Sequence, residues 1–290
     1  MIKLGNPLHS LETILEVCEE GITGNRGLKA KLSVNRSNLI PFGQQYFEAA
    51  NTGGLYATLK YDAPCYKNSF LVGMLTKNEL VKLYEQYFVA KDKPARSIYD
   101  SLLNAAKEQC PFCGGIGNPR NLDHFLPKNH FPQFSLVPHN LVPSCRDCNM
   151  DGKGQAYSTR AHEQIIQPYA DNDYFFQEQW VYANYHDDHD GEPGYFEYYV
   201  HAPEGWPEND KNRAMKHFSS FDLAKRYSTQ AGKQLKTVLS QIGRQQKRGV
   251  PTGEIIEDLL TPGIEEAQFV NHWQCGMYQA LIVALEQQII

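Results

Sequence analysis

The sequence predicts an α+β protein with a zinc-stapled core in mid-chain, flanked by mainly α-helical N- and C-terminal regions and a short β-hairpin. Three observations predict this class. Helical periodicity dominates both ends, two Cys-x-x-Cys pairs enclose a central segment rich in Pro, Gly, Asn and His, and two Tyr-rich, β-prone stretches follow. The 290 residues are 41% hydrophobic, which suffices to bury a core and excludes wholesale disorder.

We divide the chain into four segments on this basis. They are a mainly helical N-terminal region (1–94), the zinc-bearing core (95–160), an acidic Tyr-rich β segment (161–210) and a basic helical region (211–290).

The N-terminal region shows several helix signals. Apolar residues from Leu11 to Cys18 lie on one helical face behind Ser10. The break at Gly24 precedes a second, short helix over 28–32. Residues 55–61 fit a short strand, although their Ala and Leu content leaves the type open. Thr76 and Glu79 form a capping box for a helix over 77–89, and Pro94 begins another over 95–108.

The C-terminal half alternates between strand and helix signals. Strands are expected at 180–185 and 194–201, joined by an acidic turn that is better explained as a solvated turn than as a second metal site. A long amphipathic helix over 221–248 has an apolar stripe of Ala224, Tyr227, Ala231, Leu235, Val238 and Ile242. A last helix over 264–287 places Phe269, Trp273, Met277, Leu281 and Leu285 on one face.

Charge changes abruptly along this half, within a net charge of -5. Residues 161–210 hold twelve Asp or Glu and no Lys or Arg, whereas 211–248 hold ten Lys or Arg and one acid. The longest apolar run, 280–285, is far shorter than the roughly 20 residues of a membrane helix. With no signal-peptide pattern at the N-terminus, we expect a cytoplasmic protein without membrane insertion.

Four of the seven cysteines form the two Cys-x-x-Cys pairs, which are 31 residues apart: Cys110, Cys113, Cys145 and Cys148. Four thiolates make a closed tetrahedral site, so we expect structural Zn²⁺ there rather than four unrelated buried thiols. The three remaining cysteines, Cys18, Cys65 and Cys275, are expected to be small buried side chains.

The residues between and after the pairs suit phosphodiester hydrolysis. A neutral histidine such as His124 is a general base for water near pH 7. Asp123 and Asn149 offer the oxygen ligands that Mg²⁺ prefers.

This segment resembles the HNH endonucleases, which have a ββα-metal active site. The resemblance covers about 97–153 and rests on Asp123-His124, on Asn140 before Leu-Val, and on Asn149 after the second cysteine pair. It implies that His124 is the general base, that Asp123 and Asn149 hold a catalytic Mg²⁺ or another divalent cation, and that Asn140 braces the loop. One departure is that Lys153 lies one residue beyond the usual lysine position. Residues 131–145 look especially like HNH proteins of bacterial anti-phage defence systems such as Septu or Zorya, which implies an ATPase or membrane complex as partner or another protein regulator.

Contacts to DNA are expected from two groups of cations. Near the site the candidates are Lys128, Arg146 and Lys153; on the basic helix they are Lys225, Arg226, Lys233 and Lys236. Alternatively, this helix pairs with the acidic segment 161–210, or that segment covers the DNA path until a partner displaces it.

The predicted function is therefore metal-dependent hydrolysis of DNA by an HNH endonuclease, which as a monomer should nick one strand. The alternative is a four-cysteine zinc module that binds nucleic acid or a protein partner without catalysis.

Overall fold

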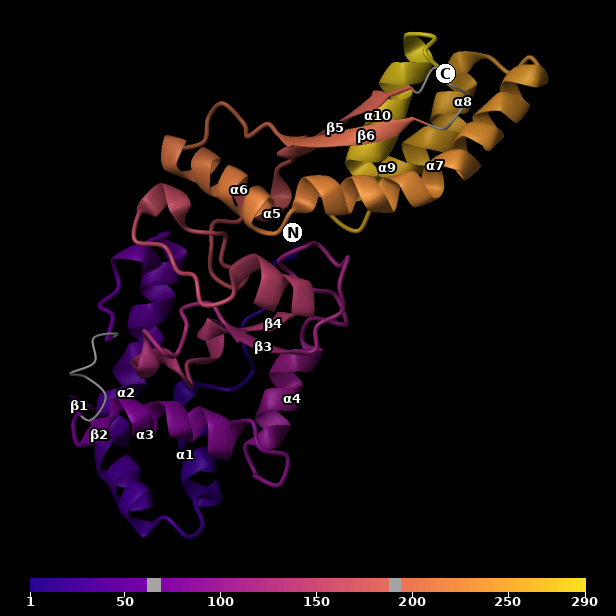
Figure 1. The fold of residues 1–290 in the computed structure, drawn as a ribbon. Helices are drawn as coiled ribbons and strands as arrows, with labels where there is room; N and C mark the ends of the chain where they lie inside the picture. Colours follow the sequence, from indigo (N-terminus) through magenta and orange to yellow (C-terminus); the bar gives the residue numbers. More distant parts are fainter. Residues whose placement is uncertain (62–68, 188–193) are drawn as a thin grey trace. The chain divides into compact units, whose positions relative to one another are not determined.

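A computed structural model describes residues 1–61, 69–187 and 194–290 (Figure 1). The chain forms two compact units, one of residues 2–172 and one of residues 173–290 with Met1. In these described residues, helices combine with three two-stranded sheets, so the α+β class is confirmed. The boundary after Asn172 falls inside the predicted acidic segment 161–210. Cys65 and most of the predicted acidic turn, 188–191, lie outside the described residues.

The first unit contains four helices longer than one turn and two of the sheets among its described residues. Its helices are α1 (Leu11–Gly21), α2 (Arg26–Asn51), α3 (Lys77–Lys82) and α4 (Arg96–Asn104), and its strands are β1 (Phe70–Val72), β2 (Leu75–Thr76), β3 (Asn121–His124) and β4 (Leu141–Ser144). Between these elements lie two π-helical turns, η3 (Leu83–Phe88) and η6 (Asp147–Lys153), and short 3-10 turns.

Helix α1 matches its prediction, with Ser10 as N-cap and Ile14, Leu15 and Cys18 fully buried. Helix α2 does not, because it continues for 26 residues where a short helix was expected. Pro41 lies inside it. A proline removes one backbone hydrogen bond, and here the buried face that runs from Leu28 to Ala50 holds the helix together on both sides of it. The possible strand over 55–61 is also wrong, since Leu55–Ala57 form a 3-10 turn.

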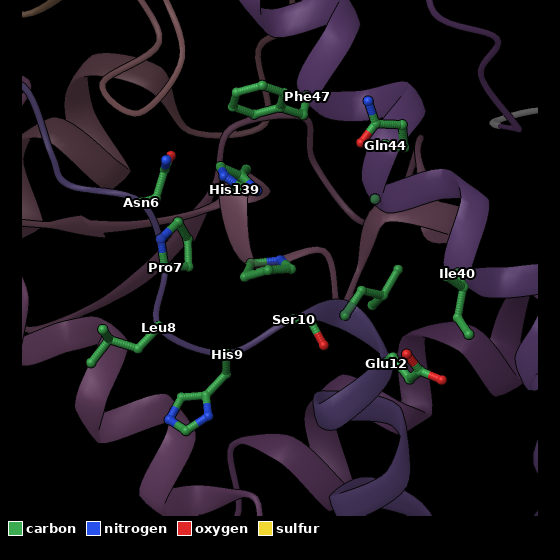
Figure 2. A pocket seen from close by; sticks show the side chains of 13 residues that line it. Asn6, Pro7, Leu8, His9, Ser10, Glu12, Ile40, Gln44, Phe47 and His139 are labelled. Atoms are coloured by element: carbon green, nitrogen blue, oxygen red, sulfur yellow. The ribbon is translucent and has the colours of Figure 1, made fainter.

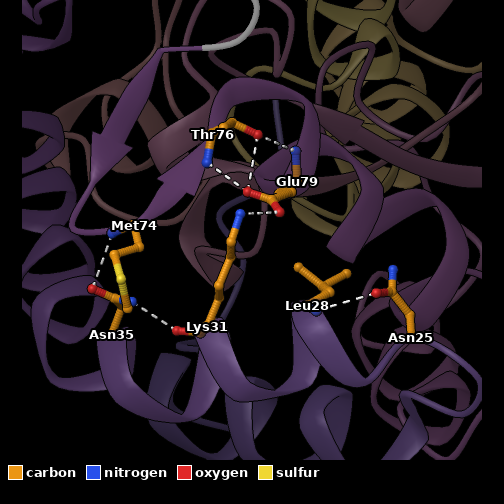
Figure 3. Close-up of polar contacts among 7 residues, drawn as sticks. All are labelled: Asn25, Leu28, Lys31, Asn35, Met74, Thr76 and Glu79. Carbon is orange, nitrogen blue, oxygen red and sulfur yellow. Dashed lines mark hydrogen bonds and ion pairs between the residues drawn. The ribbon is translucent and has the colours of Figure 1, made fainter.

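Polar side chains join α2 to the β1–β2 turn and to α3 (Figure 3). Lys31 pairs with Glu79 at 2.7 Å, and Glu79 completes the predicted capping box with Thr76. Asn35 accepts a hydrogen bond from the backbone N–H of Met74 at 3.2 Å. Its Oδ1 would lie 1.7 Å from a Cβ at Gly73, where φ is also +55°, so only glycine fits that turn.

Helix α4 ends earlier than predicted, at Asn104. Lys107 and Glu108 then adopt left-handed backbone conformations, which turn the chain sharply into Cys110. Beyond the first cysteine pair, β3 and β4 pair antiparallel with Asp123 opposite Val142 and His124 opposite Leu141. This short ribbon carries the predicted catalytic pair between the two cysteine pairs.

The second unit confirms the predicted hairpin. It contains strands β5 (Val181–His186) and β6 (Tyr195–Val200), and helices α5 (Tyr174–Gln177), α6 (Glu208–Ser220), α7 (Leu223–Lys247), α8 (Thr252–Ile255), α9 (Thr261–Glu265) and α10 (Trp273–Glu286), with a π-helical turn η8 (Ile256–Leu260). Helix α10 packs along β5 and helix α7 along β6 (Figure 1).

Two details of the C-terminal helices differ from prediction. The stripe of α7 is buried from Tyr227 to Ile242, but Ala224 is exposed at the start of the helix. The single helix expected over 264–287 is broken into α9 and α10. Asn271, buried in the connection, explains the break because its side chain bonds backbone groups elsewhere in the unit. Among the described residues, we find no helix whose length and hydrophobicity would let it span a membrane.

Candidate functional site

The four paired cysteines come together in the first unit. The Sγ atoms of Cys110, Cys113, Cys145 and Cys148 all lie within 4.8 Å of one another, and all four side chains are buried. The backbone N–H of Gly117 donates to Cys113 Sγ at 3.4 Å, a bond that favours the thiolate. The neighbouring Cys110 thiol lowers the pKa of Cys113 to about 7. The cluster was predicted, and it could hold a metal ion.

Its donor chemistry suits zinc. With Zn–S bonds of about 2.3 Å, the sulfurs of a tetrahedral site are about 3.8 Å apart. Cys113 Sγ and Cys145 Sγ, from different pairs, lie 4.0 Å apart. Such a site ties residues 110–113 to residues 145–148 and so fixes both ends of the segment that carries β3 and β4.

A small cavity of about 200 Å³ lies beside β3. Three of the predicted active-site residues line it together, namely Asp123, His124 and Asn149. Successive residues of a strand face opposite sides, but His124 ends β3, so the chain can turn there and both side chains reach one cavity. Tyr84 and Lys128 also contribute to the wall.

Hydrogen bonding and ring packing fix the His124 ring. Its Nε2 lies 3.0 Å from the backbone oxygen of Ser135. A carbonyl oxygen can only accept, so Nε2 carries the proton and Nδ1 keeps the lone pair that a general base needs. Tyr84 packs edge-on against the ring, with centroids 4.3 Å apart. Burial lowers the pKa of His124 to about 3, so the ring is neutral at pH 7.

Asn140 fastens the loop that follows β3. Its Oδ1 accepts from the backbone N–H of Leu126 at 2.7 Å, and its Nδ2 donates to the backbone oxygens of Leu126 and Phe134, both at 3.1 Å. The side chain is completely buried. Since Phe134 adjoins Ser135, the same side chain helps to hold the carbonyl that orients His124.

Asp123 is paired with a lysine rather than left to solvent. Its Oδ2 lies 3.2 Å from Lys153 Nζ, which also donates to the backbone oxygen of His124 at 2.7 Å. Burial raises the pKa of Asp123 to about 6, and the Lys153 charge opposes this shift. Burial also lowers the pKa of Lys153, while Asp123 raises it.

The π-helical turn η6 explains why a lysine one residue late still reaches this position. In a π turn the bond runs from residue i+5 to residue i, here from Gly154 N–H to the Asn149 oxygen at 2.8 Å. The turn therefore holds one residue more than an α turn and brings Lys153 back toward β3. The predicted phosphate contact of Lys153 needs correction, because its side chain is only 3% exposed and its ammonium contacts Asp123 and backbone carbonyl groups.

The other predicted DNA contacts are more accessible. Lys128 is half-buried at the cavity wall, 3.6 Å from Glu85, and its ammonium lies 5.7 Å from the centre of the Tyr84 ring. Arg146 is exposed. In the second unit Lys225, Lys233 and Lys236 are exposed on α7, and Arg226 is half-buried with a hydrogen bond to the Phe221 oxygen.

Two features of the site are not predicted from the sequence, the contact of Tyr84 and the pairing of Lys153. In the sequence, Tyr84 is identified only as an apolar position of its helix, and nothing in its spacing indicates a contact with His124. The pairing of Lys153 with Asp123 depends on the π turn, which the sequence signals only through the shifted lysine.

A larger cavity in the same unit, drawn in Figure 2, has no lining residue in common with this site. Its volume is about 550 Å³, and its wall includes Asn6, His9, Gln44, Phe47 and His139. The rings of Phe47 and His139 lie 5.0 Å apart. None of the described residues lining it is Lys or Arg, so it is poorly suited to hold a phosphate.

Comparison with known proteins identifies a relative that matches almost the whole chain. The chain is 41% identical over 291 residues to protein ea31 of Escherichia phage lambda, and the match covers 97% of each chain. No family model matches the sequence. No solved structure matches it either.

Proposed function

The chain belongs to the family of protein ea31 of Escherichia phage lambda, and we propose that it is a metal-dependent HNH endonuclease that hydrolyses DNA phosphodiester bonds. One observation carries the proposal. Asp123, His124 and Asn149, which the resemblance to HNH endonucleases singles out, line one cavity beside β3.

In this proposal each residue has one role. His124 takes a proton from the attacking water at Nδ1, with Nε2 held by the Ser135 oxygen. Asp123 and Asn149 are the ligands of a divalent cation such as Mg²⁺, which would stabilise the charge that develops on the phosphate and the leaving oxygen. The negative phosphate stabilises the imidazolium that forms when His124 takes the proton.

Zinc at the four cysteines has a structural role in this scheme. Four protein ligands leave no open position for substrate, so zinc there would stabilise the segment from 110 to 148 without taking part in hydrolysis.

In this proposal, cations with at least partly accessible side chains contact the DNA backbone. In the first unit Lys128 is the candidate at the cavity and Arg146 lies just before η6; in the second unit the candidates are the exposed lysines of α7. Because phosphate neutralisation releases counterions, we expect the affinity for DNA to fall steeply with salt.

A plasmid-nicking assay tests the proposal. The wild-type protein with Mg²⁺ should convert supercoiled plasmid to open circles, and EDTA should abolish the reaction. His124→Ala should lower the rate by about 10²–10⁴-fold, the contribution typical of a general base.

His130→Ala is the matched control, because His130 lies in the loop that follows β3 but does not line the cavity. It should cleave at the wild-type rate. Full activity of His124→Ala would contradict the proposal and favour the alternative of a zinc module that binds without catalysis.

Two narrower expectations rest on the proposed chemistry and on the resemblance. One active site cuts one strand, so a plasmid that became linear without an open-circle stage would contradict the monomer nickase. The role as effector of an anti-phage defence system, with an ATPase, membrane complex or other regulator as partner, stays a prediction. This role predicts that cells which carry the whole defence system lose phage resistance when His124 alone is replaced by Ala.

A further inference from the structure

The charges around the small cavity cancel in the free protein. The buried carboxylate of Asp123 faces the ammonium of Lys153 at 3.2 Å, and Lys128 at the wall faces Glu85 at 3.6 Å. His124 is neutral. A cation that enters beside Asp123 therefore meets no net negative charge.

Lys153 is also held firmly in place. Its three N–H groups have three sets of acceptors: the His124 oxygen at 2.7 Å, the Gly154 oxygen at 3.4 Å, and the Asp123 carboxylate. The side chain is 3% exposed, so solvent does not compete for the ammonium. Since two backbone oxygens anchor it, the ammonium stays beside Asp123 when a second cation approaches.

From this arrangement we propose that the divalent cation and the nucleic acid bind the site together, because the scissile phosphate supplies the negative charge that Lys153 cancels. This inference rests on the proposed function and deepens it. One ionised carboxylate and one neutral amide, Asn149, are too few ligands for tight Mg²⁺ binding, which normally draws on substrate phosphates as well. The compensated carboxylate weakens the free site further, because the repulsion between like charges a few ångströms apart is substantial in a buried site.

The physical consequence is that the empty protein holds its catalytic cation weakly and only the DNA complex becomes fully loaded. Hydrolysis is then confined to phosphates that fill the cavity together with the ion. Lys153 acts here as a positioning residue, since it touches Asp123 and not the substrate.

Mn²⁺ binding, followed by electron paramagnetic resonance on the full chain with its cysteines loaded with zinc, tests the proposal without any reading of activity. The His124→Ala background prevents cleavage. Addition of a 20-base-pair DNA duplex should tighten Mn²⁺ binding by about tenfold or more.

Variants at position 153 test the effect of Lys153 on Mn²⁺ binding without DNA, at pH 8. Lys153→Met removes the charge and keeps much of the length, so it should bind Mn²⁺ about tenfold more tightly than the same protein with Lys153. Lys153→Arg keeps the charge and should bind as weakly as wild type. Adding Asp123→Asn to Lys153→Met should abolish the gain, which locates the ion. Melting curves of each variant show whether it is folded.

Equal Mn²⁺ affinity with and without DNA, together with no gain in a folded Lys153→Met, overturns the inference. If Lys153→Met gains affinity but the protein with His124 intact neither binds nor cuts the duplex, the charge compensation by Lys153 stands and the proposed nuclease function fails. If plasmid is nicked but Lys153→Met shows no gain, the nuclease function stands and the role of Lys153 fails.

Discussion

Asn140 in the first unit and Asn271 in the second are both buried and both bond backbone groups, but the surroundings of the two side chains differ. Asn140 in the first unit holds a loop beside a polar cavity and a cysteine cluster. Asn271 in the second accepts from the backbone N–H groups of Trp180 and Val181 and donates to the Glu178 oxygen, within an apolar core. Similar polar contacts therefore support a candidate reaction site in one unit and only the packing of a hairpin in the other.

The regular structure around the two asparagines also differs. Strands β3 and β4 have four residues each and lie among turns, whereas β5 and β6 have six residues and pack against long helices. The middle of the first unit also buries apolar side chains, among them Phe125, Phe134 and Val137, but most of them lie in turns rather than in long strands or helices. Metal ligation and hydrogen bonds would therefore add to its stability. The second unit is stabilised mainly by apolar burial along α7 and α10.

The largest expected effect is the loss of the metal from the first unit. A chelator, or Cys113→Ser, should strongly lower its melting transition, because structural zinc contributes on the order of 10 kcal/mol in small zinc peptides. The transition of the second unit should stay in place. Differential scanning calorimetry distinguishes the two.

Cys275→Ser is the matched control, because Cys275 is a buried cysteine of α10 outside the cluster. Its effect should be confined to the second unit and should not depend on metal. Equal, metal-independent losses in both variants would show that the cluster is only a group of buried thiols.

Leu235→Ala should produce the next largest effect, in the opposite unit. Leu235 is 1% exposed in the stripe of α7. Its truncation should cost about 2–5 kcal/mol of unfolding free energy through lost burial and a cavity. Chemical denaturation measures the loss, and zinc content should not change. Lys236→Ala, one residue on and exposed, should change stability by less than about 0.5 kcal/mol.

The two asparagines give the most direct comparison. Asn140→Ala and Asn271→Ala should each cost about 1–3 kcal/mol or somewhat more, because each leaves buried backbone groups without partners. Only Asn140→Ala should also lower the nicking rate, since that side chain supports the loop that orients His124. A loss of nicking in folded Asn271→Ala, or full nicking in Asn140→Ala, would remove the distinction between the units.

The smallest effect concerns pH and the second unit. Burial lowers the pKa of His272 to about 4, and its side chain caps α10 by accepting from the Gln274 N–H at 3.4 Å. Above pH 6.5 the His272 imidazole is neutral in both the folded and the unfolded chain, so its stabilisation is complete. As the pH drops from 6.5 to about 4, the imidazole gains a proton in the unfolded chain first, and the stabilisation falls. His272→Asn keeps a capping acceptor without titrating, so its unfolding free energy should fall less between pH 6.5 and 4. Parallel pH curves for the two proteins would contradict this.

Sequence periodicity predicts the second unit better than the first. The stripe of α7 and the β5–β6 hairpin follow from local patterns, because each element buries one face. The continuation of α2 through Pro41 and the break between α9 and α10 depend on tertiary contacts that no local pattern contains.

For the candidate site, spacing alone predicts the cysteine cluster, since two Cys-x-x-Cys pairs provide four ligands. The residue types and the resemblance point to Asp123, His124 and Asn149, and the structure places them around one cavity. The partners of those residues could not be predicted. Tyr84 reaches His124 from a distant helix, and Lys153 reaches Asp123 through a π turn.

The central claim is that one cavity holds a divalent cation and the phosphate to be cut, and anomalous diffraction tests it most directly. Crystals of His124→Ala with a DNA duplex and Mn²⁺ should show an ion about 2.1 Å from oxygens of Asp123 and Asn149, with a DNA phosphate as a further ligand. A well-ordered complex with an anomalous peak only among the four cysteines would contradict the claim and leave a zinc-bearing binding protein.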